Sequence, residues 1–177
     1  VMEGCFIELT ETLRPDRPIQ SKPFPRISYR EAMEKYGSDK PDLRFDLTFV
    51  DVSDIAKDSG FGVFASAVEA GGVVRAMRVP GGSQLSRKDI DDLTDLAQRH
   101  GAKGLAWVRV GEESGPVVKN SSPEFLIALN EQTGATEGDI IFFAAGPFPH
   151  ALEPLGQVRR ECARRLNLID ESVWSYL

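Results

Sequence analysis

Ile140-Ile-Phe-Phe-Ala-Ala145 contains no polar side chain at any position. The run is short and begins with two β-branched residues, features that favour a strand over a buried helix. Because both faces of such a strand are apolar, we expect it to be a central strand of a sheet.

Outward from this run, toward the N-terminus, further short segments are predicted to be strands: residues 48–52, 61–68, 73–79, 104–110 and 115–119. The link Glu69-Ala-Gly-Gly72 is short and rich in glycine, which is typical of a hairpin between 61–68 and 73–79. Residues 115–119 are expected to be a short partner of 104–110. Residues 53–56 are expected to form a single helical turn.

Two amphipathic helices are predicted between these strands. Ser86 can cap the first, which ends at His100-Gly101 and has Ile90, Leu93, Leu96 and Ala97 on its apolar face. Ser122 and Pro123 begin the second, and Gly134 ends it. From residue 61 onward the order is β-β-α-β-β-α-β. This order predicts the α+β class: a two-layer α/β sandwich with a mixed or antiparallel sheet and helices on one face.

The segment before this unit is predicted to contain two helices and a connector. Met2, Cys5, Phe6 and Leu9 recur at helical spacing and predict a short helix end, and four prolines within residues 14–25 favour an extended connector. Ser28 and Glu31 have the form of a capping box for a two-turn helix that ends before Gly37. The chain begins within a pattern and stops on an apolar run, so we expect it to be a piece of a longer protein.

Residues 151–166 predict one amphipathic helix after the unit. Its inner side is expected to carry Leu152, Leu155, Val158, Cys162 and Leu166. Its outer side is expected to carry four arginines: Arg159, Arg160, Arg164 and Arg165. Such arginines can contact RNA or simply face solvent, and solvent is the simpler interpretation.

The charge of the chain is unevenly distributed. Residues 45–150 contain 15 acidic and nine basic side chains and hold the whole formal charge of −6, whereas both flanks are neutral. An acidic unit is a poor candidate for sequence-independent binding of nucleic acid. A composition that is 41% hydrophobic argues against disorder, and no apolar run is long enough to cross a bilayer. The first residues lack the basic part of a signal peptide, and the two cysteines match no metal or CxxC spacing, so we expect a cytoplasmic protein.

The side chains most often used in catalysis are sparse. His100 and His150 lie at predicted helix ends, where capping or exposure is favoured over catalysis. Cys5 and Cys162 lie on helical faces among apolar neighbours, so both are expected to be buried rather than nucleophilic. No catalytic residue and no metal ligand are assigned.

Two other clusters have a possible binding role beside a structural one. Residues 79–86, Val-Pro-Gly-Gly-Ser-Gln-Leu-Ser, can form an anion-binding nest, but they match neither phosphate-loop pattern, and a structural turn is favoured. Asp89, Asp91, Asp92 and Asp95 suggest a divalent cation, but they lack calcium-loop spacing, and a solvated helix face is favoured.

The most specific string in the chain is Tyr36-Gly-Ser-Asp-Lys-Pro-Asp-Leu-Arg44. Pro41 stiffens a loop whose charged side chains are Asp39, Lys40, Asp42 and Arg44. These groups can pair with one another or with a carboxylate or phosphate elsewhere. Composition does not decide between the two.

Residues 23–44 closely resemble the bacterial-type aspartyl-tRNA synthetases, in the stretch that leaves the catalytic core after class II motif 2. Three strings are similar to the insertion (GAD) domain of that family, a DCoH-like sandwich: Arg78-Val-Pro-Gly-Gly82, Gly101-Ala-Lys-Gly-Leu-Ala106 and Gly138-Asp-Ile-Ile-Phe-Phe143. Residues 155–172 resemble the return into the core. The same domain type occurs in a subunit of an archaeal tRNA-dependent amidotransferase.

The resemblance implies three parts: 1–44, a stub of the catalytic core with its connector; 45–150, the insertion domain; and 151–177, a helix that returns to the core. It implies a dimeric parent enzyme that attaches aspartate to tRNA with ATP and magnesium. The parent's catalytic motifs and its aspartate and ATP sites lie outside this chain, so the segment itself is expected to be inactive and to hold no cofactor. Candidate contacts to the tRNA acceptor arm are Lys40, Arg44, Arg159 and Arg160. A GAD module of a Glu-tRNA(Gln) amidotransferase subunit is the alternative. Whether the parent charges one or both of tRNA-Asp and tRNA-Asn stays open.

Overall fold

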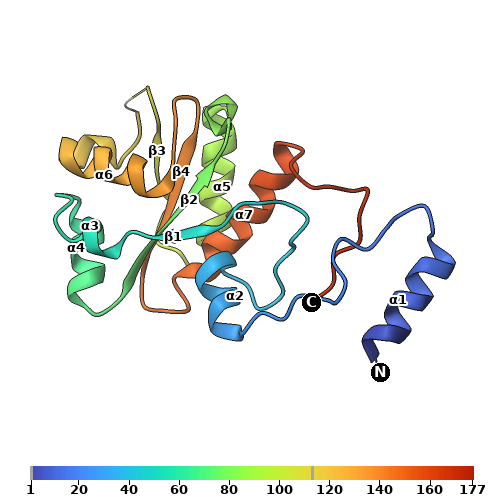
Figure 1. The fold of residues 1–177 in the computed structure, drawn as a ribbon. Helices are drawn as coiled ribbons and strands as arrows, with labels where there is room; N and C mark the ends of the chain where they lie inside the picture. The colour runs from blue at the N-terminus through green and yellow to red at the C-terminus, as the bar shows by residue number, and fades with distance from the viewer. Residues whose placement is uncertain (1, 113) are drawn as a thin grey trace.

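A four-stranded sheet forms the centre of the computed structural model, which describes residues 2–112 and 114–177 (Figure 1). The strands are β1 (Phe49–Asp51), β2 (Val73–Val79), β3 (Ala106–Arg109) and β4 (Ile140–Gly146). Their order across the sheet is β1-β2-β4-β3, and every neighbouring pair is antiparallel. β4 lies between two other strands, which confirms the central strand predicted at 140–145.

Helices cover both faces of this sheet. Ile140 and Phe142 point into one core, with α5 (Arg87–Arg99) and α7 (Leu152–Arg165). Ile141 and Phe143 point into a second core with three helices on the opposite side of the sheet: α3 (Ser53–Ala56), α4 (Gly62–Glu69) and α6 (Pro123–Thr133) (Figure 1). Alternate residues of a strand face opposite sides, so a strand that is apolar at every position supplies both cores.

The structure confirms the α+β class and selects the antiparallel alternative for the sheet. Helical cover lies on both faces, where the sequence predicted helices on one face. The second helical layer arises because residues 61–68 lie in a helix and not in the sheet.

The strand predicted at 61–68 is wrong, and so is the hairpin to 73–79. The segment forms α4, in which Phe64 is fully buried and Phe61 and Val68 pack against the same core. These three positions are spaced by three and four residues, which is the helical period. Alanines within the segment add helix propensity, and the glycine pair that follows ends the helix instead of turning a hairpin.

The partner strand predicted at 115–119 is also wrong. Ser114 makes an isolated bridge to Arg109 of β3, and Val118–Asn120 then form a 3₁₀ turn. Pro116 has no N–H to offer a ladder, so a strand at this place would lose one of its hydrogen bonds.

Helix boundaries predicted from capping residues are confirmed. Ser86 accepts a hydrogen bond from the N–H of Asp89, whose carboxylate accepts one from the Ser86 N–H in return. Ser122 caps α6, and Gly134 takes the left-handed conformation after its last turn. At α2 (Tyr29–Tyr36), Ser28 is the cap as predicted. Glu31 does not complete the predicted capping box, since its carboxylate pairs with Lys35 instead.

The two flanks of the chain meet each other. α1 (Met2–Leu13) leads into the proline-rich connector, which is not helical, as predicted, but contains a turn at residues 15 and 16 and several bends. Ile19 in this connector forms a parallel bridge with Trp174, whose N–H donates to the Pro18 carbonyl at 2.8 Å. Figure 1 shows the C-terminal segment beside the connector, with α1 apart from the sheet.

No helix within 2–112 and 114–177 combines the length and the apolar character needed to span a membrane.

Candidate functional site

The chain enters and leaves the sheet domain at one place, where α2 lies against α7 (Figure 1). The incoming segment, residues 37–47, runs along the outgoing helix α7. The contacts between the two are made by Gly37, Asp42, Phe45, Leu47, Gly156 and Arg159. We call these six residues the junction.

Arg159 is the centre of the junction. Its exposed fraction is 2%, and its guanidinium donates three hydrogen bonds to main-chain carbonyls of the incoming segment. Nη2 donates to the carbonyls of Asp42 at 3.0 Å and Phe45 at 3.2 Å, and Nε donates to that of Leu47. The prediction that Arg159 lies on the outer side of the helix is therefore wrong. A guanidinium committed to three internal acceptors is not open to a phosphate of a bound nucleic acid.

Two aromatic rings complete the environment of this guanidinium. Its carbon lies 4.1 Å from the ring centroid of Phe45 and 4.8 Å from that of Tyr36, within the range of cation–π attraction. Burial lowers the pKa of Arg159 to about 10, so the group still carries its charge at neutral pH. Among the described residues, no carboxylate lies within ion-pair distance of it. The charge is balanced by carbonyl dipoles, ring faces and the more distant carboxylates of Asp42 and Asp46.

A glycine pair lies beside Arg159 in the junction. A Cβ on Gly156 of α7 would overlap the carbonyl oxygen of Gly37, and a Cβ on Gly37 would overlap the carbonyl oxygen of Leu152. Gly37 also has a φ of 63°, the left-handed conformation that favours glycine after a helix. The two helix backbones touch here because neither residue has a side chain.

The charged loop before the domain pairs with itself, one of the two possibilities left open by its composition. Arg44 donates to both carboxylate oxygens of Asp42, from Nε at 2.9 Å and from Nη2 at 2.7 Å. This hydrogen bond from Arg44 lowers the pKa of Asp42, although partial burial opposes the shift. The Lys40 side chain is exposed. Of the predicted phosphate contacts in this loop, Lys40 is therefore open, and Arg44 is half-buried and paired.

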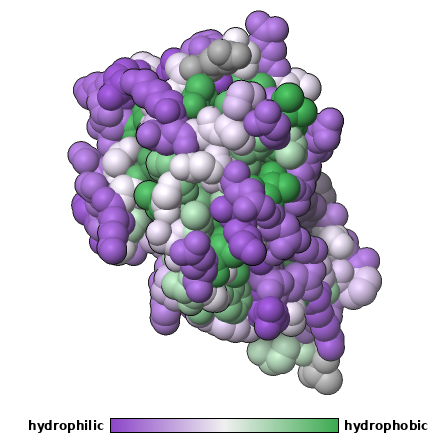
Figure 2. Space-filling view, turned by 90° about the vertical axis from the view of Figure 1, so that its left-hand side faces the viewer, coloured by the Kyte–Doolittle hydropathy of each residue, from purple (hydrophilic) through white to green (hydrophobic). Residues whose placement is uncertain are grey.

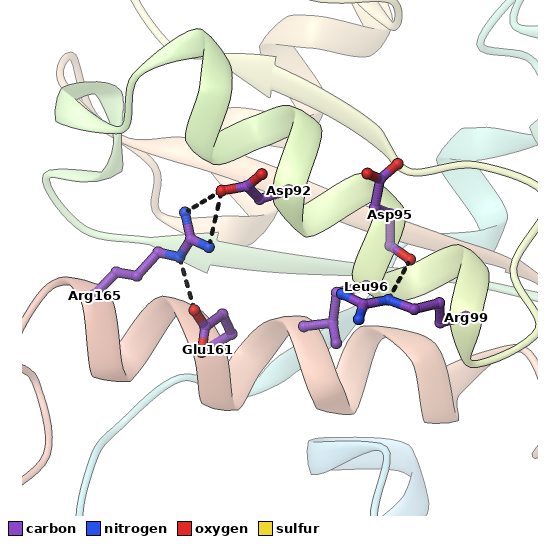
Figure 3. Close-up of a pocket in the computed structure, with 6 residues that line it drawn as sticks. All are labelled: Asp92, Asp95, Leu96, Arg99, Glu161 and Arg165. Atoms are coloured by element: carbon purple, nitrogen blue, oxygen red, sulfur yellow. Dashed lines mark hydrogen bonds and ion pairs between the residues drawn. The ribbon is translucent and has the colours of Figure 1, made fainter.

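The other arginines of α7 differ from one another. Arg160 is exposed and donates to the Gln157 amide oxygen on its own helix. Arg164 pairs with Glu161 at 2.7 Å. Arg165 reaches across to α5 and contacts Asp89. Figure 3 shows it between Asp92 of α5 and Glu161 of its own helix. The predicted outer stripe thus contains one buried residue, two exposed residues and one that links two helices.

The aspartate cluster on α5 takes part in this link. Asp89 and Asp92 pair with Arg165, and Asp91 pairs with Arg87 on its own helix. Figure 3 shows Asp92, Asp95 and Glu161 around the hollow between α5 and α7. Within the described part of the chain, no group of three or more metal-ligating side chains is placed to hold an ion. Half of the cluster is therefore engaged with α7, where the sequence favoured a fully solvated face.

The glycine-rich loop at 79–86 is a structural turn, the alternative that the sequence favoured. Gly81 is left-handed, and its N–H donates to the Asp139 carboxylate at 3.0 Å. Asp139 also accepts from Arg78 at 2.7 Å. The anion held at this loop is a carboxylate of the chain itself.

The histidines and cysteines offer no catalytic arrangement among the described residues. His100 is the exposed C-cap of α5, and His150 is exposed with Glu153 at 3.7 Å. Cys162 is buried as predicted, and burial raises the pKa of its thiol to about 12. Cys5 is exposed, so its predicted burial is wrong for this structure. α1 has no buried residue because it packs on neither core.

The face formed by α3, α4 and α6 has a different character. Figure 2 shows apolar atoms between hydrophilic margins on this side. Val63 and Ile127 are exposed by 58% and 61%. The exposed acidic residues of this face are Asp54, Asp58, Glu69, Glu124 and Glu131. Negative charge here disfavours contact with phosphates.

Sequence reasoning missed the roles of Arg159, Gly156 and Asp139. One signal for Arg159 was present: with Leu155 and Cys162 it follows the helical spacing of four and three residues, which places it on the apolar stripe. Gly156 also carried a hint, because glycine inside a helix is costly unless a close approach requires it. Nothing local to Asp139 indicates its distant partners.

Comparison with known proteins places this arrangement in a family. The GAD domain family matches residues 64–155, about half of the chain. The chain belongs to the GAD domain family. The match includes β2, β3, β4 and the helices between them, while β1 lies before it.

Longer relatives of this GAD domain chain are ligases. It is 51% identical over 158 residues to the aspartate–tRNA ligase of Limosilactobacillus fermentum, which covers 88% of this chain and 27% of that protein. It is 50% identical over 161 residues to the aspartate–tRNA(Asp/Asn) ligase of Salinispora tropica, with 88% and 26% covered. The ligase of the same name from Rubrobacter xylanophilus is 46% identical over 178 residues, with 99% and 30% covered. The chain thus spans less than a third of the length of these relatives.

Proposed function

We propose that this chain is the insertion region of an aspartate–tRNA ligase, an enzyme that joins aspartate to tRNA with ATP. The observation that carries the proposal is the extent of the similarity. The GAD match covers residues 64–155, whereas the ligase relatives align over 158 to 178 residues and so include both flanks. A GAD module of an amidotransferase subunit, the alternative, does not account for the flanks.

The path of the chain supports an insertion. An inserted domain needs two connections to its host that lie side by side. Here the incoming connector bridges the outgoing segment at Ile19 and Trp174. Closer to the domain, the N–H of Asp170 donates to the Arg44 carbonyl at 3.1 Å, and Arg159 joins the same two segments. The two connections therefore run together from the flanks to the sheet.

In this proposal the chain itself does no chemistry. Aspartate, ATP and magnesium are proposed to bind to other parts of the ligase. In this proposal the ligase is a dimer in the cytoplasm. The contacts between its subunits lie outside this chain. The proposed role of the GAD domain is to form one wall of the space that receives the tRNA acceptor arm.

We place the tRNA on the junction side of the molecule. Lys40 and Arg160 are exposed there and form no ion pair among the described residues, and Arg44 is half-buried. The other exposed cations of α2 and α7, Arg30, Lys35 and Arg164, pair with glutamates of their own helices. Phosphates attract exposed lysine and arginine, whereas the opposite face formed by α3, α4 and α6 carries exposed acids. Arg159 is excluded from this set by its burial.

Aminoacylation by the full-length protein tests the activity. We expect ATP-dependent attachment of aspartate to tRNA-Asp. Relatives of similar identity carry both ligase names, so parallel assays with tRNA-Asn determine whether that tRNA is charged as well. Attachment of aspartate to neither tRNA would overturn the proposal.

A double variant tests the tRNA-facing side. Lys40→Gln with Arg160→Gln is expected to weaken tRNA binding and to lower the slope of log Kd against log salt by about 2, one for each lost phosphate contact. Lys57→Gln with Lys119→Gln makes the same change of charge at exposed positions of the α3 and α6 side and is the matched control. Equal salt slopes for both double variants would contradict the assignment of this side to tRNA.

A further inference from the structure

Burial of the Arg159 guanidinium is energetically costly. A cation with an exposed fraction of 2% has lost its hydration. Among the described residues no carboxylate lies within ion-pair distance of it, and Asp42 and Asp46 attract it only from farther away. Such a buried charge contributes little net stability, and well-packed apolar residues often replace it without loss. Its partners are main-chain carbonyls, whose positions depend on backbone path. The group is therefore better suited to fix geometry than to add stability.

The geometry that it fixes joins the two connections of the domain. The three acceptors lie at positions 42, 45 and 47, just before β1, and the donor lies on the helix that follows β4. A planar guanidinium can hold several acceptors in one plane at defined angles, whereas a lysine ammonium is a compact charge on a flexible stem. The rings of Tyr36 and Phe45 restrict the plane further.

The glycine pair supports the same role independently. Gly156 lies three residues before Arg159, and its backbone touches that of Gly37. Glycine within a helix is less favourable than alanine, so its place in α7 needs a reason. Close approach of α2 to α7 supplies that reason. The hydrogen bonds of Arg159 and the glycine pair thus both hold the incoming segment, residues 37–47, against α7.

We propose that Arg159 is a positioning residue that sets the orientation of the GAD domain relative to the flanking core and, through it, the approach of the tRNA acceptor arm. This inference rests on the proposed function. Activation of aspartate by ATP takes place in the rest of the ligase and does not depend on the domain's orientation. Transfer of aspartate to tRNA does depend on the orientation of the domain.

Steady-state kinetics of the full-length ligase separate the two steps. Arg159→Lys keeps the charge but cannot hold three carbonyls in one plane. We expect it to lower kcat/KM for tRNA in aminoacylation about tenfold, since small misplacements cost factors of this size, and to leave ATP–pyrophosphate exchange within about twofold of wild type. Gly156→Ala separates α2 from α7 with Arg159 intact, and we expect the same pattern from it. Arg164→Gln, on the exposed side of the same helix, is the matched control and should change neither rate.

Each result decides the matter. A lower kcat/KM for tRNA with normal ATP–pyrophosphate exchange supports the positioning role. If Arg159→Lys does not fold, Gly156→Ala still allows this measurement. Normal values of both rates in both variants overturn it. A parallel fall of both rates with a lowered melting temperature indicates a purely structural residue and also overturns it. Absence of any aspartylation by the wild-type ligase refutes the proposed function instead.

Discussion

Asp139 accepts a hydrogen bond from Nε of Arg78 at 2.7 Å, and its second carboxylate oxygen accepts from the Gly81 N–H at 3.0 Å. Two further hydrogen bonds come from the N–H and the hydroxyl of Thr136. This single carboxylate, with an exposed fraction of 4%, ties the loop after β2 to the start of β4. It occupies the amide that a phosphate or another anion would need.

Removal of this carboxylate is expected to destabilise the fold. Asp139→Ala leaves the N–H groups of Gly81 and Thr136 and the charge of Arg78 without their acceptor, so we expect a loss of about 3 kcal/mol in the free energy of unfolding. Urea denaturation of the 1–177 chain measures it. Glu137→Ala removes a nearby exposed carboxylate and should change the value by less than about 0.5 kcal/mol. A loss below about 1 kcal/mol for Asp139→Ala would show that water replaces the network.

Lowering the pH is expected to destabilise the folded chain because Glu161 becomes protonated. The hydrogen bond from Arg164, with further help from Arg165, lowers the pKa of Glu161 to about 2 in the folded state. A carboxyl whose folded pKa lies below its unfolded value of about 4.3 stabilises the fold fully above that value. The contribution disappears as the pH falls toward about 2. The difference in unfolding free energy between wild type and Glu161→Gln should therefore be largest near neutral pH and shrink between about pH 5 and pH 2.

Urea denaturation at a series of pH values checks this dependence. Glu131→Gln changes an exposed carboxylate of α6 that makes no ion pair among the described residues, so its difference from wild type should stay small throughout. A Glu161→Gln difference that does not vary with pH would count against the ion pairs with Arg164 and Arg165.

Two glycines are expected to respond differently to alanine. A Cβ on Gly82 would overlap Cγ2 of Ile140 and lie 3.2 Å from Cβ of Val79, both fully buried, so Gly82→Ala should cost about 2 kcal/mol of stability. Gly4, on α1, has no atom within 4 Å of such a Cβ. Gly4→Ala should leave stability unchanged or raise it by up to about 1 kcal/mol. Equal effects of the two substitutions in thermal unfolding would mean that the loop at 79–86 shifts to accept the methyl group.

The two cysteines are expected to differ in reactivity. The Cys162 thiol is buried with its pKa raised to about 12, whereas Cys5 is exposed. A disulfide reagent at pH 8 should modify one thiol per 1–177 chain in the native state and two in denaturant, because a buried thiol with a high pKa yields little thiolate. The Cys5→Ser variant should show none before unfolding. Rapid native modification of that variant would mean that α7 opens readily.

Local signals in the sequence predicted much of the fold. The apolar run at 140–145 is an inner strand whose alternate residues are buried in the cores on the two faces of the sheet. Ser28, Ser86 and Ser122 mark helix starts, since their hydroxyls satisfy N–H groups within the next turn. These interactions span three residues and are visible in the sequence itself.

Segments whose pattern fits two structures were decided by their neighbours. Residues 61–68 are apolar enough for a strand or a helix, and burial of Phe64 against Phe125 and Phe143 selects the helix. With that helix the sheet acquires its second covered face. Residues 115–119 likewise form no strand with β3, and a 3₁₀ turn follows instead.

The α+β class, the inner strand, the capped helices and the likeness of the flanks to a tRNA ligase could be predicted from the amino-acid sequence, because these depend on spacing within short stretches. The roles of the charged side chains could not, because they depend on three-dimensional packing. Arg159 and Arg160 are adjacent in sequence, yet one is buried on the carbonyls of residues 42, 45 and 47 and the other faces solvent. One residue along a helix turns the side chain by about 100°, and whether that direction meets solvent or backbone depends on segments more than a hundred residues away.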